Sequence, residues 1–579
     1  MMCDASRVTR RDRGSCQRLS AAIFIALRQF QIRTEWLWVT PLPRQPRGRA
    51  RTQPRCRSSG SPVAPVAATG RRQPAVRLTP ADAASLRITV NQGAWMVDNF
   101  GGPPAPAGQL SRHQQLAIGA LAASFLMVAV ESTSVYVAIP SIQRGLALST
   151  GTVQWLMSAF LISFGGLLLL SPRLAGLFGR RRLFAAGLAV VTSASLLSAV
   201  AWSGGVLIAA RALQGAGAAL IAATALPLLV IALGSGLVRA RALGLWTLIG
   251  AFGGTAGLLL GGLLTDGPGW RWVFLVNVPV GITAALLVPV LPADPCPRSG
   301  RPLDLVGAAS LIGALALFGW AIVDAFAGDG SVGGTLLRMA GSAVLLLLFL
   351  VSESRAARPL VRPELLRSRT RLAGLVVLLA AGTVVDGMLL LITLYGQQSL
   401  GLSAIGYGAL MAALTLPSVI GSYAGQAVVL RLGLRTVTMS GMALAGAGLL
   451  ALAMVRGPLA TGNIVGVLPV IGAGAGAAFV AAQIAVTLGA SDADSPTVSG
   501  LTDASFSIGG ALGLAVVSAA LVAHQAAPGS PAAPAQVAAG LQTAFAVAAG
   551  LAAVGLLAAF LLLRRGIAAR PVALREPGV

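Results

Sequence analysis

Apolar runs of about 20 residues follow one another from about residue 115, and polar segments separate them. A helix of about 20 apolar residues crosses the ~30 Å hydrocarbon core of a bilayer. These runs lack the two-residue alternation of membrane-barrel strands, which argues against a β-barrel. The predicted helices lie near 115–139, 151–171, 182–202, 205–233, 240–264, 271–291, 304–323, 334–352, 371–394, 404–429, 435–455, 462–488, 498–523 and 541–563.

This pattern predicts an all-α polytopic membrane protein of about 14 transmembrane helices, in two six-helix bundles plus two additional central helices. The composition agrees, since 55% of the residues are hydrophobic and only 11% are charged. A soluble protein is about a quarter charged.

The chain carries a net charge of +25 and contains no lysine. A basic balance of this size can indicate nucleic-acid binding. About half of the excess, however, lies in the first ~110 residues, and most of the remainder lies in loops on one side of the membrane. We therefore expect no nucleic-acid partner.

The distribution of arginine predicts the orientation. With the N-terminus inside, the inner loops and the C-terminal tail hold about 20 arginines, and the outer loops hold about three, which are Arg144, Arg271 and Arg456. Positive residues favour the cytoplasmic side. We expect a multi-pass protein of the cell membrane with both termini cytoplasmic.

The sequence predicts five segments. They are a disordered Arg/Pro-rich arm (1–112), an N-terminal six-helix bundle (113–291), a linker with two extra helices (292–370), a C-terminal six-helix bundle (371–565) and a cytoplasmic tail (566–579). The arm cannot bury enough apolar surface to offset its ordering entropy. It is either translated upstream sequence, with the working protein starting near Met96, or a tail that binds anionic lipid.

A polar turn, Ser171–Arg182, is predicted between the second and third spans. Its Phe178-Gly179-Arg180-Arg181 is echoed by Leu432-Gly433-Leu434-Arg435, which follows the second span of the later bundle. The echo indicates an internal repeat, and repeated bundles are common in transporters with a substrate site between them.

Among the charged residues inside predicted spans, three stand out: Glu131, Arg211 and Asp386. A charge in hydrocarbon costs at least ~2.5–3.5 kcal/mol, so each must face a cavity, pair or lose its charge. Glu131 is either a proton-exchanging group or an acid satisfied by its helix neighbours. Arg211 needs acceptors, which can be backbone carbonyls or Glu131, or else it anchors its helix near the outer face. Asp386 either binds a cation or proton, or bonds to Thr383 or lumenal water.

Small residues recur at four-residue steps in the fifth span, at Gly253, Gly257 and Gly261, with Gly262 beside the last. Glycines four apart lie on one helix face and let two helices approach closely. The packing serves either a moving interface between bundles or static helix contacts.

Nothing in the sequence indicates an enzyme. A phosphate loop with lysine and an HExxH motif are both absent, and His113 and His524 are far apart. Cys3, Cys16, Cys56 and Cys296 match no zinc or redox spacing. We expect no cofactor, no metal site and no ATP-driven pump.

Short patterns accompany the charged residues: Glu131-Ser132-Thr133 with Ala138-Ile139-Pro140, Gln154-Trp155, Leu174-Ala175 with Gly179-Arg180-Arg181, Arg211 with Gln214, Gly215 and Gly217, the four glycines above, and Trp270-Arg271-Trp272 with Asn277 and Pro279. Together they resemble the major facilitator superfamily, and more narrowly its 14-span drug:proton antiporter branch. The resemblance covers about residues 113 to 565. The match at Trp270–Pro279 is the most specific.

The resemblance implies a role in proton coupling for Arg211 and a gating role for Gly179, Arg180 and Arg181. The chain departs from the family where Gly176 replaces an Asp and Leu177 an Arg in the loop motif. These departures remove the charges of the usual gate and leave an orienting role for the arginines.

The sequence therefore predicts proton-coupled efflux of amphipathic drugs or antibiotics by a monomer whose partners are a small-molecule substrate, protons and the lipid bilayer. Two alternatives stay open. One is transport of a specific metabolite such as an amino acid or a siderophore, because one fold serves many substrates. The other is a non-transporting membrane sensor or scaffold.

Overall fold

A computed structural model describes residues 111–233, 237–293, 305–326, 331–355, 365, 367–455, 461–491, 494–524 and 533–563. The predicted arm up to residue 110, the whole predicted tail (566–579), the four cysteines and Arg456 lie outside the described residues.

Within the described ranges, 13 helices are long and apolar enough to cross a membrane. The fold class predicted from the sequence is confirmed. The elements are α2 (Arg112–Gly145), α3 (Thr150–Val153), α4 (Trp155–Phe178), α5 (Arg180–Ala199), α6 (Gly204–Leu233), α7 (Leu237–Asp266), α8 (Arg271–Leu275), α9 (Asn277–Leu287), η1 (Val288–Val290), α10 (Leu305–Phe326), α11 (Val332–Arg355), α13 (Arg369–Leu394), η2 (Tyr395–Ser399), α14 (Ala404–Ala453), α15 (Thr461–Thr487), α16 (Ser495–Val522) and α17 (Ala533–Leu562).

Helix α14 contains two of the predicted spans. It has 50 residues, and Gly433 interrupts it with φ 81° and ψ 159°. The 13 helices therefore account for all 14 predicted segments.

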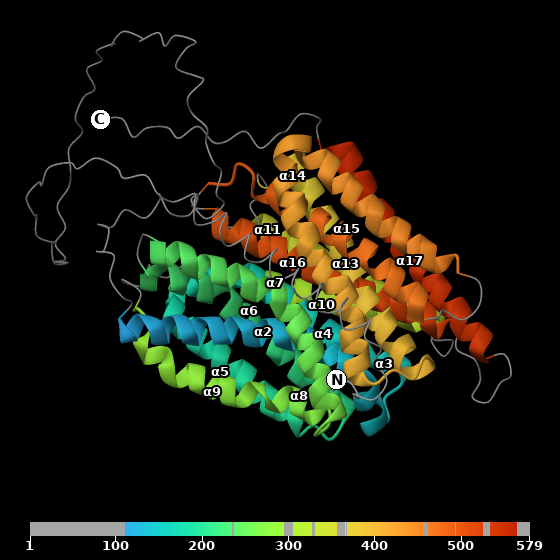
Figure 1. Ribbon diagram of the computed structural model, residues 1–579, viewed down its shortest axis with the longest axis horizontal. Coiled ribbons are helices and arrows are strands. Elements are labelled where there is room, and N and C mark those ends of the chain that lie inside the picture. The colour runs from blue at the N-terminus through green and yellow to red at the C-terminus, as the bar shows by residue number, and fades with distance from the viewer. Residues whose placement is uncertain are drawn as a thin grey trace, which may run out of the picture. The chain divides into compact units, whose positions relative to one another are not determined.

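Helices α2 to α9, the N-terminal half, pack mainly on one another, through the pairs α2–α7, α4–α6 and α5–α6. Helices α13 to α17, the C-terminal half, do the same through α14–α15, α13–α16 and α14–α17. Figure 1 shows the two groups side by side. We call the boundary between them the seam. It is formed by α4 against α16, α7 against α14 and α2 against α13.

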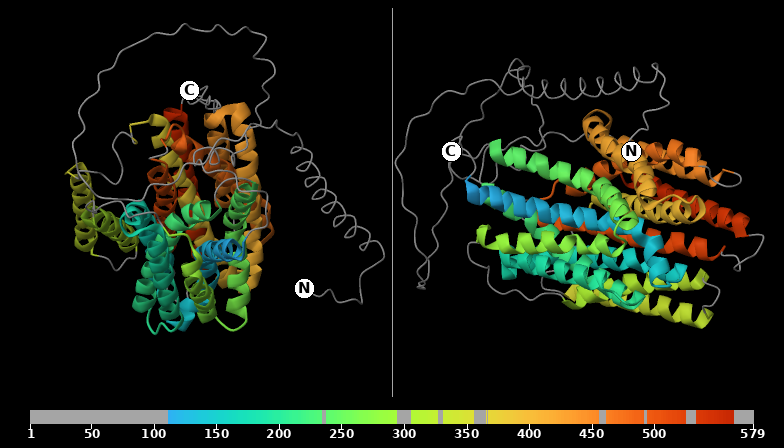
Figure 2. Two further views of the ribbon diagram at one scale, coloured as in Figure 1. Left: turned by 90° about the vertical axis from the view of Figure 1, so that its left-hand side faces the viewer. Right: turned by 60° about the horizontal axis from the view of Figure 1, so that its bottom comes forward.

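The two additional helices are central in the sequence but peripheral in space. Helix α10 packs on α4 and on α16, and α11 packs on α10. Only 6% of the most apolar window of α11 is buried, against 83% for α13. The left view of Figure 2 shows this yellow-green pair at one edge of the helices.

The predicted turn at Ser171–Arg182 is wrong in extent. Helix α4 continues to Phe178, α5 begins at Arg180, and Gly179 alone separates them with φ 84° and ψ 143°. The polar residues of this stretch led to the prediction of a loop. A helix that extends out of the membrane, however, also carries polar residues on its last turns. Gly433 adopts nearly the same backbone angles, so the internal repeat extends to the backbone conformation.

Candidate functional site

Glu131 lies inside the N-terminal half and is 1% exposed. Helix α2 carries it, and α6 and α9 both pack against α2. Its Oε1 atom lies 2.7 Å from Nη1 of Arg211 on α6, and its Oε2 atom accepts a hydrogen bond from Nδ2 of Asn277 on α9. Both carboxylate oxygens are therefore occupied by donors from other helices.

Arg211 is fully buried and has four further partners, one of which is the Met157 sulfur, 3.7 Å from its Nη2. Its Nε donates to the Leu156 carbonyl oxygen at 2.8 Å, and its Nη1 also reaches Oε1 of Gln214 at 3.1 Å. Its Cζ atom lies 4.4 Å from the centroid of the Phe160 ring, a cation–π contact. Arg211 thus has both kinds of acceptor that the sequence suggested, a backbone carbonyl and Glu131.

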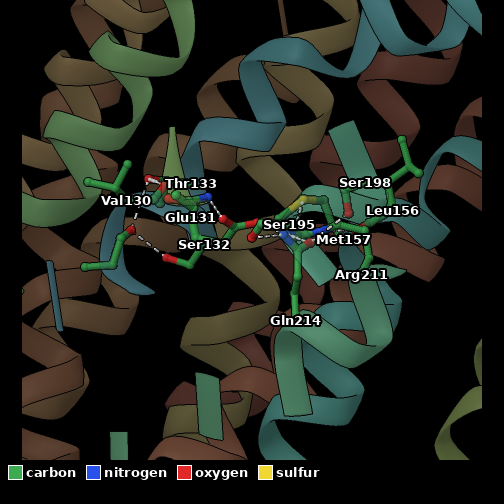
Figure 3. A network of polar contacts seen from close by, with 12 residues as sticks. Val130, Glu131, Ser132, Thr133, Leu156, Met157, Ser195, Ser198, Arg211 and Gln214 are labelled. Carbon is green, nitrogen blue, oxygen red and sulfur yellow. Dashed lines mark hydrogen bonds and ion pairs between the residues drawn. The ribbon is translucent and has the colours of Figure 1, made fainter. Parts of the chain in front are cut away.

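Gln214 extends this network to α5. Its Nε2 donates to Oγ of Ser195 at 2.9 Å, and Ser198 Oγ donates to Gln214 Oε1 at 3.4 Å. Figure 3 shows these side chains converging between the helices. Gly215, next to Gln214, lies so close to the Phe160 backbone that an added Cβ would overlap it. The small residue lets α6 approach α4, which brings Arg211 within reach of the Leu156 carbonyl.

Of the residues from Trp270 to Pro279, one contacts Glu131 and the others make contacts elsewhere in the N-terminal half. Arg271 stacks on Trp270 at 4.4 Å and donates to the Ala201 carbonyl at 3.3 Å, whereas Trp272 is 47% exposed. Pro279 lies in the first turn of α9, and its carbonyl accepts from Thr283. Only Asn277 reaches the buried acid.

Asp386 lies on α13 and is bound from the other half. The hydroxyl of Tyr136 on α2 donates to its Oδ1 at 2.8 Å. Both residues are buried, and Oδ2 of Asp386 has no hydrogen-bond partner among the described residues. Thr383, which the sequence offered as a partner for Asp386, donates instead to the carbonyls of Leu379 and Gly509.

Comparison with known proteins shows the family to which the chain belongs. The family model of the major facilitator superfamily matches residues 121–514. The chain belongs to the major facilitator superfamily.

Two relatives of this transporter carry names that refer to antibiotics. Puromycin resistance protein pur8 of Streptomyces alboniger is 33% identical over 402 residues, 68% of this chain and 79% of the relative. Cephamycin export protein CmcT of Amycolatopsis lactamdurans is 34% identical over 404 residues, 69% of this chain and 83% of the relative. The crystal structure of the nucleoside transporter NupG has a TM-score of 0.54, with 11% identity over 78% of this chain and all of that chain. That likeness concerns the fold alone.

Three of the four ladder glycines pack within the N-terminal half of the transporter. An added Cβ would meet Ala129 at Gly253, Val130 at Gly257 and Ser134 at Gly261, all on α2. Gly262 points the other way, to the backbone of Ala404 and Ile405 at the start of α14. Of the four, only Gly262 therefore belongs to the seam.

Gly179, Arg180 and Arg181 lie apart from the buried acid. They stand at the start of α5, which joins the network only at Ser195. Fifteen residues of helix correspond to about 22 Å along its axis. The structure does not bring this segment together with Glu131 or Asp386.

Polar contacts join the two halves near the ends of α2 and α7. Gln397 donates to the Val137 carbonyl at 2.9 Å, and Gln398 donates to Gln143 at 2.9 Å. The Asp266 carboxylate accepts from the backbone N–H groups of Ala404 and Ile405, at 3.1 and 2.9 Å. These contacts close the seam at that end.

Sequence reasoning missed two residues that the structure brings into view. Tyr136 carried no signal, because its partner is 250 residues away. Asp503 did carry one: it is an acid inside the predicted span 498–523, and the cost that singled out Asp386 applies to it equally.

Proposed function

We propose that this transporter exports amphipathic small molecules, such as antibiotics, from the cytoplasm in exchange for protons. The observation that carries the proposal is the fully enclosed Glu131 carboxylate, held by Arg211 and Asn277. An acid removed from water is the group that a proton-coupled transporter needs, because it can take up and release one proton per cycle.

Arg211 supports this role because it does not depend on Glu131 alone. If Glu131 takes up a proton, Arg211 still has the Leu156 carbonyl, Gln214 and the Phe160 ring as partners. A buried cation that loses all its partners costs several kcal/mol, about 3–5 when one member of a pair is removed. The remaining partners lower that cost, so the neutral acid is an accessible state.

Alternating access is the second part of the proposal. The contacts of Val137, Gln143 and Asp266 with the C-terminal half lie at the end of the spans opposite to the N-terminus of α2. With both termini cytoplasmic, as the arginine distribution favours, this is the outer end. The described conformation would then be closed to the outside, and the 113–291 and 371–565 bundles would rock to open it.

The substrate class rests on the relatives. Proteins with these names act in puromycin resistance and in cephamycin export. Export of such compounds requires a site that accepts amphipathic molecules of different shapes, which the long apolar helices of the two halves can provide.

The test uses purified transporter in lipid vesicles with an imposed pH gradient. Addition of puromycin should produce proton movement across the membrane in the native protein, and the Glu131→Gln variant should abolish it. Glu353→Gln, on the peripheral helix α11, is the matched control and should leave it unchanged. Drug-dependent proton movement that persists in Glu131→Gln would refute the role of this acid.

A further inference from the structure

Gln154 and Ser158 are buried polar side chains that the contacts described so far do not use. Gln154 is 1% exposed and Ser158 is 3% exposed. Among the described residues, neither the carboxamide oxygen nor the nitrogen of Gln154 has a hydrogen-bond partner, and the Ser158 Oγ has none. Gln154 directly precedes α4, yet its side chain makes no capping bond to that helix. Buried polar groups almost always have partners, so three such atoms together indicate a site for a molecule that supplies the bonds.

Both side chains line a cavity at the junction of three helices. Gln154 and Ser158 are four residues apart and therefore lie on one helical face. Leu315 and Gly319 of α10 and Ala515 of α16 line the other sides. Counting its open side, the cavity contains about 270 Å³ of unfilled space, slightly less than the ~300–1,000 Å³ of typical small-molecule sites. It is also narrow, so only a slender molecule fits.

Gly319 keeps this cavity open on the side of α10. A Cβ atom added at Gly319 would lie 3.9 Å from the Cβ of Ala515 and 3.9 Å from Cη2 of Trp155, which are ordinary contact distances. A methyl group would therefore fill part of the cavity without displacing its neighbours. Because glycine is among the weakest helix formers, its place in the middle of α10 suits a position where space is required.

The lining of the cavity determines the chemistry of a bound molecule. None of the ten described residues that line it is charged, so a charged group would enter without compensation. A hydroxyl group has one donor and two acceptor lone pairs. It can therefore donate to Oε1 of Gln154 while it accepts from the Ser158 hydroxyl. Apart from the Trp155 ring, the remaining walls are aliphatic side chains and a glycine, which suit a carbon chain.

We propose that the cavity between α4, α10 and α16 is a binding site for slender neutral amphiphiles that carry a hydroxyl group. Gln154 and Ser158 bind the hydroxyl, and the apolar walls bind the chain. A molecule bound there contacts one helix of each half as well as α10, so its binding favours the conformation in which these three helices stay together. The inference is independent of proton exchange, because the groups that bind the hydroxyl are neutral.

The experiment measures quenching of tryptophan fluorescence by brominated probes in the detergent-purified transporter, without any gradient. The probes are bromobutanol with a terminal bromine and n-pentyl bromide, in which a methyl group replaces the hydroxyl, at matched free concentrations. Bromobutanol should quench saturably, and Trp155→Phe should remove the saturable part, because Trp155 lines the cavity. Gln154→Met should weaken bromobutanol binding about tenfold and leave n-pentyl bromide unchanged. Ser158→Ala should weaken bromobutanol binding about threefold.

Two further variants separate the hydroxyl contacts from the space of the cavity. Gly319→Ala fills part of the cavity and should weaken both probes, while α10 keeps its helix because alanine is the better helix former. Gln542→Met is the matched control, since Gln542 donates to the Val455 carbonyl at 2.7 Å, and it should change the binding of neither probe.

Three results would overturn the site. They are bromobutanol quenching with no saturable part that depends on Trp155, which would mean that the cavity binds water only, bromobutanol binding that is unchanged in Gln154→Met, or an equal loss for both probes in that variant. If Gln154→Met does not fold, Ser158→Ala and Gly319→Ala decide the matter, and unchanged bromobutanol binding in both counts against the site. Because no gradient is used, binding that behaves as expected stands even if proton-coupled export fails.

Discussion

The hydroxyl of Tyr136 and the carboxylate of Asp386 lie 2.8 Å apart and join helices from opposite halves of the transporter. Both side chains are buried, and the Tyr136 bond is the one that the structure gives to this carboxylate. The bond can exist only while α2 and α13 stay together at this level. It therefore stabilises the conformation in which the seam is closed there.

Replacing Tyr136 by Phe should open that seam more often. A hydrogen bond to a charged group contributes about 1.5–3 kcal/mol, so the equilibrium should shift about tenfold or more. The measurement is the distance between spin labels at the ends of α2 and α13. Tyr407→Phe is the control, because the Tyr407 hydroxyl donates to the Leu389 carbonyl within one half. A matching shift in both variants would show that the Tyr136 bond has no special part in closure.

The Glu131–Arg211 pair should show coupling in a double-mutant cycle. Arg211→Met leaves a buried carboxylate with Asn277 alone and should cost about 3–5 kcal/mol in the free energy of unfolding. Glu131→Gln should cost less, because Arg211 keeps the Leu156 carbonyl and Gln214. The loss in the free energy of unfolding of the double variant should be about 1–3 kcal/mol smaller than the sum of the two single-variant losses. Detergent-induced unfolding in mixed micelles measures each value, and strictly additive losses would contradict the pairing.

The individual members of the site could be found from the sequence, because a charge in an apolar run is costly wherever it stands. Glu131, Arg211 and Asp386 all followed from that argument, and it should also have given Asp503. The partners could not be found in this way. Tyr136 reaches Asp386 across 250 positions, and Asn277 reaches Glu131 across 146. Only the packing of α2 on α9 and α13 brings them together.

Alanine substitutions at the glycines of α7 should have two different effects, one on the stability of the fold and one on the opening of the seam. Gly257→Ala places a methyl group 2.7 Å from the Val130 carbonyl and should lower the free energy of unfolding by about 1–3 kcal/mol. Gly262→Ala meets the backbone of α14 across the seam, and opening of the seam relieves that overlap. It should favour the open conformation and leave unfolding nearly unchanged.

The free energy of unfolding and the balance between open and closed conformations are obtained from the same unfolding and spin-label measurements. Gly244→Ala, with no heavy atom within 4 Å of the added methyl group, is the control and should stabilise α7 by up to about 1 kcal/mol. If Gly262→Ala destabilised the fold as much as Gly257→Ala, the division between static and moving contacts would not hold.

Gly179 and Gly433 should both resist substitution. Their φ angles of 84° and 81° with extended ψ belong to a region that is essentially restricted to glycine. Alanine at either position should cost about 1–3 kcal/mol in the free energy of unfolding. Gly176→Ala, three residues earlier in the helical part of α4, should instead be neutral or stabilising. A loss at Gly176 equal to the loss at Gly179 would argue against a conformational cause.

The extent of the turn before α5 shows what sequence patterns leave open. Arg173 and the residues around it are polar enough for a loop, and only the backbone angles reveal that one glycine makes the whole turn. Hydropathy reports where a helix lies in the membrane. It does not report where the helix ends outside it.

Helix α10 touches one helix of each half, α4 and α16. Any swing of one half against the other must therefore slide α10 along one of these two neighbours, while α11 follows it. We propose that α10 and α11 thereby limit the distance by which the two halves can separate on that flank during transport.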